Sequence, residues 1–404
     1  MALRDSEAPI LAAVFLDLMG FGMVLADIQL RAEAMAPKGW RPGWIIGGLL
    51  ASTFVTQMFA SPRWGRLSDR RGRKPVFVLC TVLSAVAMLV YGLAGSLGML
   101  LLSRIISGLG AANVAVLQAY LSDRTDPSDR AAALGRIGAA ISAGLVVGPP
   151  LGGFLAASGG NHLIGLVAGS ASLIGAIWMA RALPNLPPHP TEEPEHHALF
   201  DLRLLKELPA IRSLVLIAAV AWFSLAMLEG TFARLISYLY AYDQRQFGLL
   251  FGYESFLGIV IQASLVGWVV TRVRESNVLR ISYLAQGLGL AANPFAANLL
   301  PIGPPFVLLV IASTLYSVGS SLANPTLNSL CSRLTPDSRQ GELFGLMQGA
   351  RSVGFVVGPV LGGALFDWQP AAPYIIAGVV CVLASALVPS VLSQPDPGPS
   401  QNTT

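Results

Sequence analysis

Charged residues are scarce in this sequence. Only 12% of its 404 residues are Asp, Glu, Lys or Arg, and 54% are hydrophobic, whereas soluble domains carry about 25% charged residues. Polar side chains are therefore too few to cover a water-soluble globule. This composition indicates a protein whose surface faces lipid.

The sequence also lacks the residue patterns of several chemistries. Its three cysteines, Cys80, Cys331 and Cys381, have neither CxxC nor Cys/His spacing, which argues against a disulfide framework and a zinc site. No GxxxxGK[ST] loop is present, so ATP is excluded as the energy source. Without a nucleophile elbow or an HExxH motif, we expect neither an enzyme nor a cofactor.

Long apolar runs dominate what is present. Twelve runs approach or exceed the roughly 17 to 25 residues that cross a bilayer as a helix, which predicts an all-α integral membrane protein of twelve transmembrane helices. The runs lie near residues 9–30, 44–62, 75–95, 97–122, 132–157, 162–183, 211–238, 247–270, 277–298, 303–331, 340–366 and 372–393.

The placement of basic residues predicts the orientation. Most of the 26 lysines and arginines fall in loops on the same side as the N-terminus, and such loops face the cytoplasm. We therefore expect both termini in the cytoplasm and a multi-pass protein of the bacterial inner (plasma) membrane. The cluster from Arg70 to Lys74 is explained by this topology and by lipid charge, so no nucleic-acid partner is expected.

A repeat divides the chain into two halves. GLVVGPPLGG (144–153) and GFVVGPVLGG (354–363) match at eight of ten positions with an offset of 210 residues, which indicates an internal duplication. Residues 184–208 are rich in proline and charge and are predicted to be a cytoplasmic linker. Six-helix halves over 1–183 and 209–393 then flank this linker, and 394–404 form a disordered tail.

The repeated motifs suggest hinges within the fifth and eleventh spans. Glycine- and proline-interrupted helices at matching positions of duplicated transporters border a central substrate pathway, and small residues let helix backbones approach closely. Static packing is the alternative role. The predicted hinge residues are Gly144, Gly148, Pro149, Gly354, Gly358 and Pro359.

The loop GRLSDRRGRKPVFVL (65–79) resembles the G-x-L-x-D-R-x-G-R-K signature of the major facilitator superfamily, with Gly65, Asp69, Arg70, Gly72 and Arg73 in place. The resemblance implies a gate. In the family the aspartate caps the eleventh helix and the arginine pairs with a carboxylate that ends the fourth. These roles would fall to Asp69, to Arg73 and to Asp123.

Further stretches resemble the twelve-helix drug/proton antiporters, which include tetracycline exporters. SRIISGLGAANVA (103–115) is similar to their fourth-helix motif, GLVVGPPLGG to their fifth-helix motif, and FLDLMGFGMVLADIQL (15–30) to their first helix. The third and ninth spans lack the carboxylate expected of a tetracycline exporter. The resemblance thus implies export of other small molecules in exchange for protons.

Ionisable residues inside the spans are the candidate coupling site. A charge at mid-bilayer costs about 2.5 to 3.5 kcal/mol on insertion scales and therefore marks function. Asp17 lies roughly 12 Å into the first span and Arg104 roughly 10 Å into the fourth from the other side, so we expect the two to meet. Asp17 is the predicted proton site and Arg104 the group that tunes it; a static ion pair is the alternative.

Other polar residues are candidates for binding substrate. Glu229 and Glu254 would attract a cationic drug, or pair with Arg234 instead. Arg351 would attract an anion, or pack against a polar neighbour. The neutral candidates for the cavity lining are Asn113, Gln118 and Asn324. Asp27 and Asp367 are expected at solvated helix ends without a transport role.

The sequence therefore predicts a monomeric, proton-coupled multidrug exporter that works by alternating access, with a small-molecule substrate, protons and membrane lipid as its partners. Two alternatives stay open. One is proton-coupled uptake or exchange of a nutrient, sugar or organic anion. The other is a membrane sensor that transports nothing.

Overall fold

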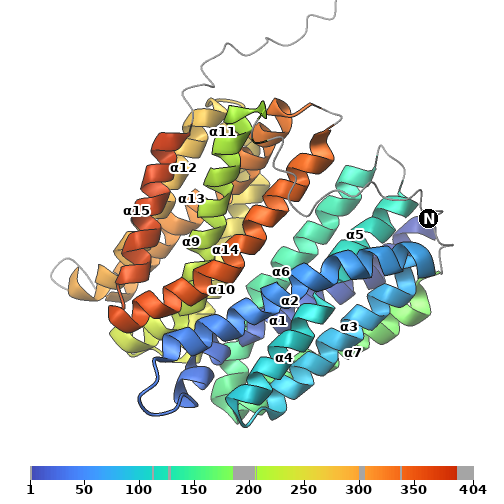
Figure 1. Cartoon of the computed structure of the whole chain (residues 1–404), viewed down its shortest axis with the longest axis horizontal. Helices are drawn as coiled ribbons and strands as arrows, with labels where there is room; N and C mark the ends of the chain where they lie inside the picture. Colours follow the sequence, from blue (N-terminus) through green and yellow to red (C-terminus); the bar gives the residue numbers. More distant parts are fainter. Residues whose placement is uncertain are drawn as a thin grey trace, which may run out of the picture.

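The computed structural model describes residues 2–111, 113–125, 129–184, 205, 207–299, 305–336 and 339–388. Helices make up almost all of these residues and no β-strand occurs among them (Figure 1). The first bundle contains α1 (Ala2–Ala34), α2 (Pro42–Arg71), α3 (Arg73–Leu93), α4 (Leu97–Gly110), α5 (Asn113–Arg124), α6 (Arg130–Gly159) and α7 (Asn161–Ala182).

The second bundle follows the segment that was predicted to be a linker, most of which lies outside the described residues. It contains α9 (Pro209–Tyr240), α10 (Gln244–Val260), a π-helix (Ile261–Leu265), α11 (Val266–Val270), α12 (Glu275–Ala292), a 3-10 helix (Asn293–Leu299), α13 (Pro305–Leu334), α14 (Gln340–Trp368) and α15 (Ala372–Leu387).

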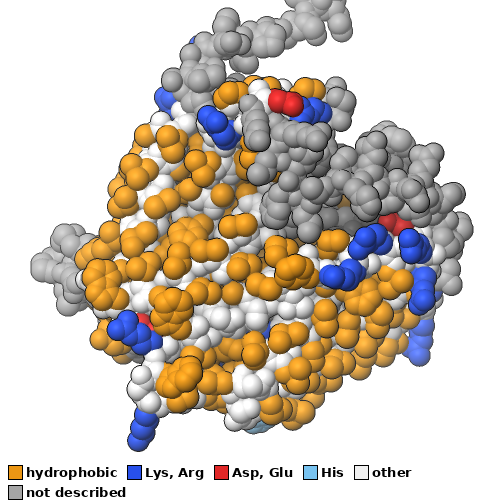
Figure 2. Space-filling view, viewed as in Figure 1, with side chains coloured by type: hydrophobic (Ala, Val, Ile, Leu, Met, Phe, Trp, Pro, Cys, Tyr) orange, Lys and Arg blue, Asp and Glu red, His pale blue; other side chains and the backbone are white. Residues whose placement is uncertain are grey.

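The helices have the length and composition of membrane spans. Nine helices within the described residues are long and apolar enough to cross a bilayer, and α4 and α15 are shorter apolar helices. Figure 2 shows hydrophobic side chains over most of the middle of one face, with Lys and Arg nearer its edges. The prediction of an all-helical integral membrane protein is confirmed.

Two expected spans are broken helices. The fourth run contains α4 and α5 with an interruption after Gly110, where the Gln57 side-chain amide donates to the carbonyl oxygen of Ala111 at 3.2 Å. The eighth run passes from α10 through the π-helix to α11. The hydropathy of the sequence did not indicate these breaks, because they leave the apolar character of each run unchanged.

The two bundles repeat one packing scheme. In the first bundle α1 lies against α6 and α7, and in the second α9 lies against α14 and α15. The bundles meet through two matching helix pairs, α2 with α14 and α6 with α10. The repeated motif lies on α6 and α14. Each copy therefore takes part in a contact inside its own bundle and in a contact with the other bundle.

Glycines allow these pairs to touch backbone to backbone. A β-carbon added to Gly43 of α2 would lie 1.9 Å from the carbonyl oxygen of Gly363, and one on Gly153 of α6 would lie 2.2 Å from that of Gln244. Such distances exclude any side chain. Pro149 faces Gly248 in the same way that Pro359 faces Gly47.

The motif glycines nearer mid-span bind each bundle internally. A β-carbon on Gly144 or Gly148 would meet the backbone of α1, and one on Gly354 or Gly358 would meet the backbone or side chains of α9. Both α6 and α14 continue through their prolines as single helices. The duplicated motif is therefore a packing surface with two faces, one toward its own bundle and one toward the other.

The contacts between bundles gather at one end of the molecule, where α1 ends and α2 begins, here termed the closed end. They extend from Gly43 and Gly363 to the rings of Phe54 and Phe355, whose centroids are 4.5 Å apart. In Figure 1, α2 and α14 cross near the closed end and diverge toward their other ends.

The glycine contacts give a matched pair of substitutions. A β-carbon at Gly47 would lie 2.5 Å from the carbonyl oxygen of Pro359, whereas one at Gly48 meets nothing within 4 Å. We expect Gly47→Ala to lower stability by about 1 to 3 kcal/mol through overpacking, and Gly48→Ala to leave it unchanged. Thermal melting in detergent measures both. Equal melting temperatures for the two variants would contradict this packing.

Candidate transport site

Asp17 lies in the interior of the first bundle. It is half-buried on α1 and accepts hydrogen bonds from the Asn113 side-chain amide at 2.6 Å and from the Ser172 hydroxyl at 3.1 Å. The three residues come from α1, α5 and α7. Neutral donors therefore hold this carboxyl group, and it has no ion-pair partner among the described residues.

Arg104 lies with a different carboxylate. Its guanidinium is 2% exposed and stacks on the ring of Tyr91 at 5.0 Å from the ring centroid, while the Tyr91 hydroxyl donates to Asp27. Asp27 lies ten residues, or about 15 Å, beyond Asp17 along α1. The expectation that Asp17 and Arg104 meet is therefore wrong, because Arg104 lies at the level of Asp27 on α1 and not at the level of Asp17.

Asp27 is the centre of a buried polar network. Its carboxylate is fully buried, accepts from Tyr91, lies 4.0 Å from the Arg31 guanidinium and accepts from the Gln244 amide of α10 at 3.2 Å. The network therefore joins the two bundles. The prediction of a solvated helix end failed because Gln244 and Tyr91 are far from Asp27 in sequence.

A second buried cluster also joins the bundles at the closed end. Arg234 of α9 is 4% exposed and donates to Glu33 of α1 at 2.9 and 3.2 Å and to Asp367 of α14 at 3.0 Å. The other oxygen of Asp367 accepts from the backbone amide of Gly43 on α2 at 2.7 Å. The expectation of a solvated Asp367 is wrong as well.

Arg234 therefore pairs with neither Glu229 nor Glu254, so the predicted alternative of a pairing with Arg234 is wrong. Glu254 is 6% exposed on α10, and the Ser317 hydroxyl donates to its backbone carbonyl at 3.5 Å. Glu229 is half-buried on α9, and its backbone carbonyl accepts from the Gln29 amide of α1 at 2.7 Å. Neither carboxylate has an ion-pair partner within the described part of the chain.

Arg351 lies near the middle of α14. Its guanidinium stacks on Trp222 of α9 at 4.9 Å and on Phe355 at 5.6 Å from the ring centroids, although the residue as a whole is exposed. It therefore packs against aromatic rings rather than against the polar neighbour that the sequence suggested.

The neutral candidates have separate surroundings. Asn113 is buried and holds Asp17. Gln118 is exposed on α5, and Asn324 is half-buried on α13 one residue before Pro325. The structure thus brings Asn113 to Asp17, the predicted coupling residue, and shows no contact of the other two with it. Ser172, a small neutral residue, gave no signal in the sequence.

The signature loop forms a tight turn. Gly72, between α2 and α3, has a φ of 94°, a value that glycine adopts without steric cost. Asp69 and Arg73 form an ion pair across the turn, and Arg73 also donates to the Ser68 hydroxyl at 2.9 Å.

The remaining predictions for this loop concern a helix cap, two further loop residues and Asp123. The N-cap residue of α14, Arg339, makes no side-chain capping hydrogen bond. The two bundles contact each other at the closed end, and this loop lies at the opposite end of α2, so the cap by Asp69 stays a prediction. Gly65 has open space around it and Arg70 is exposed. The side chain of Asp123 lies outside the described residues.

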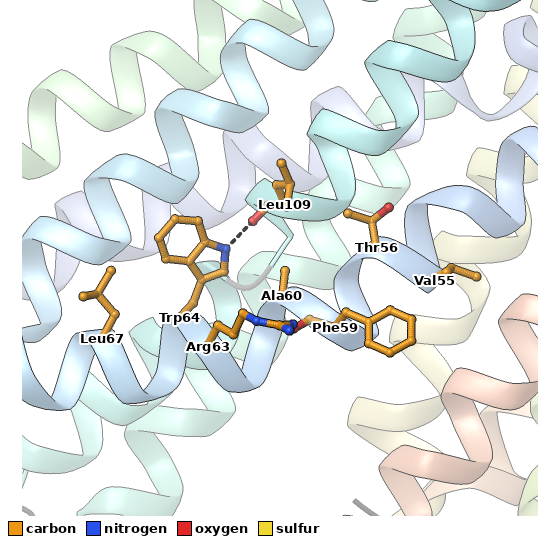
Figure 3. A pocket seen from close by; sticks show the side chains of 8 residues that line it. All are labelled: Val55, Thr56, Phe59, Ala60, Arg63, Trp64, Leu67 and Leu109. Atoms are coloured by element: carbon orange, nitrogen blue, oxygen red, sulfur yellow. Dashed lines mark hydrogen bonds between the residues drawn. The ribbon is translucent and has the colours of Figure 1, made fainter.

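A pocket of about 600 Å³ lies beside α2, away from these residues. Figure 3 shows Trp64 donating its indole N–H to the carbonyl oxygen of Leu109, at 2.8 Å. The lining residues are Val55, Thr56, Phe59, Ala60, Arg63, Trp64, Leu67 and Leu109. They occupy the side of α2 turned away from Gly43, Gly47 and Phe54, so the pocket lies outside the contact between bundles.

Comparison with known proteins decides the family. Residues 10–301 and 236–404 match the family model described as Major Facilitator Superfamily. The chain belongs to the major facilitator superfamily. Members of this superfamily are transporters and not enzymes, so the chain is a membrane transporter of small molecules.

Individual superfamily members are similar over nearly the whole chain. Multidrug resistance protein 2 of Bacillus subtilis is 25% identical over 388 residues, covering 94% of this chain and 93% of the relative. The class D tetracycline resistance protein of Salmonella ordonez is 27% identical over 365 residues, covering 88% of each. The crystal structure of the human organic anion transporter MFSD10 has a TM-score of 0.69 at 20% identity, covering 96% of this chain and 99% of that one.

The closed end of this superfamily member offers a test of its charge cluster. Asp367 is buried, with its side chain 5% exposed, whereas Glu33 is 40% exposed. Removal of one partner from a buried ion pair costs about 3 to 5 kcal/mol, and an exposed pair contributes about 1 kcal/mol or less. We expect Asp367→Asn to lower the melting temperature far more than Glu33→Gln. An equal loss in both variants would contradict the burial of the cluster.

Proposed function

We propose that this chain exports small amphipathic or cationic molecules in exchange for protons by alternating access. The observation that carries the proposal is the position of Asp17, a carboxyl group inside a membrane helix that is held by Asn113 and Ser172. Intramembrane acids of this kind serve as proton relays in transporters. The multidrug and tetracycline resistance relatives support the export of drugs.

The surroundings of Asp17 allow its carboxyl group to bind and release a proton. Its donors are an amide and a hydroxyl, so a change of protonation breaks no ion pair and leaves no charged group without its partner. Asp27 differs, because Arg31 lies beside it and Arg104 lies over the ring of its donor Tyr91. Asp17 is therefore the proposed proton site, and Arg104 belongs to the network at the closed end.

Contact between the bundles at one end only supports the alternating-access part of the proposal. Residues 1–183 and 209–393 are the two halves that rock against each other in this proposal, with 184–208 as the cytoplasmic linker and 394–404 as a tail. The basic loop between α2 and α3 lies at the opposite end of α2 from Gly43. Because such loops remain in the cytoplasm, the closed end faces outward, and both termini lie on the cytoplasmic side of a bacterial inner membrane.

The gate then has two parts. The charge clusters around Asp27 and Arg234 hold the outer end shut, and they must separate when the outer end opens. The ion pair of Asp69 with Arg73 lies at the inner end, where the signature turn would contact the second half in the opposite state. The transporter works as a monomer surrounded by lipid.

Exchange or uptake of an organic anion is the second candidate function. Arg351 favours it, because a guanidinium without a carboxylate partner lies in the middle of a membrane helix.

The role of Asp17 is tested by replacing it with asparagine. In proteoliposomes we expect Asp17→Asn to reduce accumulation of ethidium driven by a pH gradient at least tenfold, because an amide binds no proton. Ethidium counterflow without a gradient should persist, since the substrate can still cross.

The matched control for this experiment is Asp243→Asn. Asp243 caps α10 with its side chain at the surface, and asparagine caps helices equally well. This variant should transport like the wild type. Full gradient-driven accumulation by Asp17→Asn would show that the proton binds elsewhere.

A further inference from the structure

Arg351 faces the space between the bundles and not the lipid. Val353, Val357 and Leu361 are 49%, 39% and 42% exposed and form the apolar outer stripe of α14. Arg351 lies about a third of a turn away from this stripe and one turn from Phe355, whose ring contacts Phe54 of α2. The exposure of Arg351 is therefore toward the interior junction of α2, α9 and α14.

The guanidinium of Arg351 has unused hydrogen-bonding capacity. Two aromatic rings cover its face, and within the described residues it makes no hydrogen bond and no ion pair. An arginine carries five N–H donors at its edge, in a geometry that fits a carboxylate. Stacking fixes the plane of the group and leaves that edge open.

Glu229 supplies the opposite charge in the same region. It lies seven residues after Trp222 on α9, which places both on one face of that helix, and the Trp222 ring is one of those on which Arg351 stacks. Its carboxylate has no hydrogen bond or ion pair with other described residues either. By contrast Arg234, five residues further along α9, forms ion pairs with both Glu33 and Asp367.

We propose that Arg351 and Glu229 together bind a small zwitterion, whose acidic group contacts Arg351 and whose ammonium contacts Glu229. An aromatic part of the same molecule would pack on Trp222, Phe355 and Phe54, whose rings form a continuous group. This inference rests on the proposed transport of small molecules and narrows their chemical class.

Charge complementarity favours a zwitterion over an ion of one sign. A simple cation would leave the guanidinium of Arg351 without a partner and would be repelled by it. A simple anion would have the same difficulty with Glu229. Buried charges are tolerated when each is paired, and only a molecule with both charges pairs both residues. Repulsion of the wrong charge type is itself a source of specificity.

The test compares three probes that share one ring system. Norfloxacin is a zwitterion near neutral pH, its ethyl ester is a cation and its N-acetyl derivative is an anion. Binding to the purified full-length protein in detergent is measured by calorimetry without any ion gradient. We expect the zwitterion to bind at least tenfold more tightly than the ester or the N-acetyl derivative.

Two substitutions assign the charges. Arg351→Gln should weaken norfloxacin binding about tenfold and should not weaken binding of the cationic ester, because the guanidinium repels that probe. Glu229→Gln should likewise weaken norfloxacin binding about tenfold, and it should not weaken binding of the anionic N-acetyl derivative. Arg351→Lys retains the charge and should keep part of the preference. Melting temperatures identify variants that fail to fold, and each substitution tests its own half of the site.

Several outcomes would overturn the zwitterion site. They are absent binding of norfloxacin, equal affinity for the three probes, or an equal loss of all three in both variants. Because the measurement uses no gradient, it is independent of proton coupling. Selective binding of norfloxacin without transport driven by a pH gradient would refute the proposed function and leave the zwitterion site intact.

Discussion

Close approach of helix backbones at glycine is the constraint on which the rest of the structure depends. The bundles meet where α2 touches α14 and α6 touches α10, at positions where Gly43, Gly153 and Gly363 exclude side chains. The buried polar groups around Asp27 and Arg234 bond across the bundles at the same end.

Ionisable residues inside the helices lie at two levels, one at the closed end and one near mid-span. At the closed end, Asp27, Arg234 and Asp367 are buried and bonded across the bundles, so these interactions stabilise closure. Near mid-span, Asp17 has neutral partners and Arg351 has aromatic ones. In the proposed mechanism the first set separates when the closed end opens, and the second set binds protons and substrate.

Sequence reasoning predicted what depends on local pattern. The apolar runs predicted the helices, and the repeated glycine motif predicted close packing at matching positions. Sequence reasoning failed where the partner of a residue came from a distant part of the chain. Asp367 was expected to be solvated because it ends an apolar run, yet Arg234 and Gly43 surround it. Depth along a helix likewise suggested an Asp17–Arg104 pair, since the sequence does not show which helices face each other.

Distances between the two bundles test the central claim, that the closed end opens while the opposite end closes. Spin labels on cysteines at Trp40 and Tyr238, both exposed, span the closed end, and labels at Arg71 and Arg333 span the opposite end in a variant without native cysteines. Pulsed electron resonance should show a population in which the first distance lengthens while the second shortens when pH or substrate changes. Two distances that stay fixed, or that change in the same direction, would contradict the account.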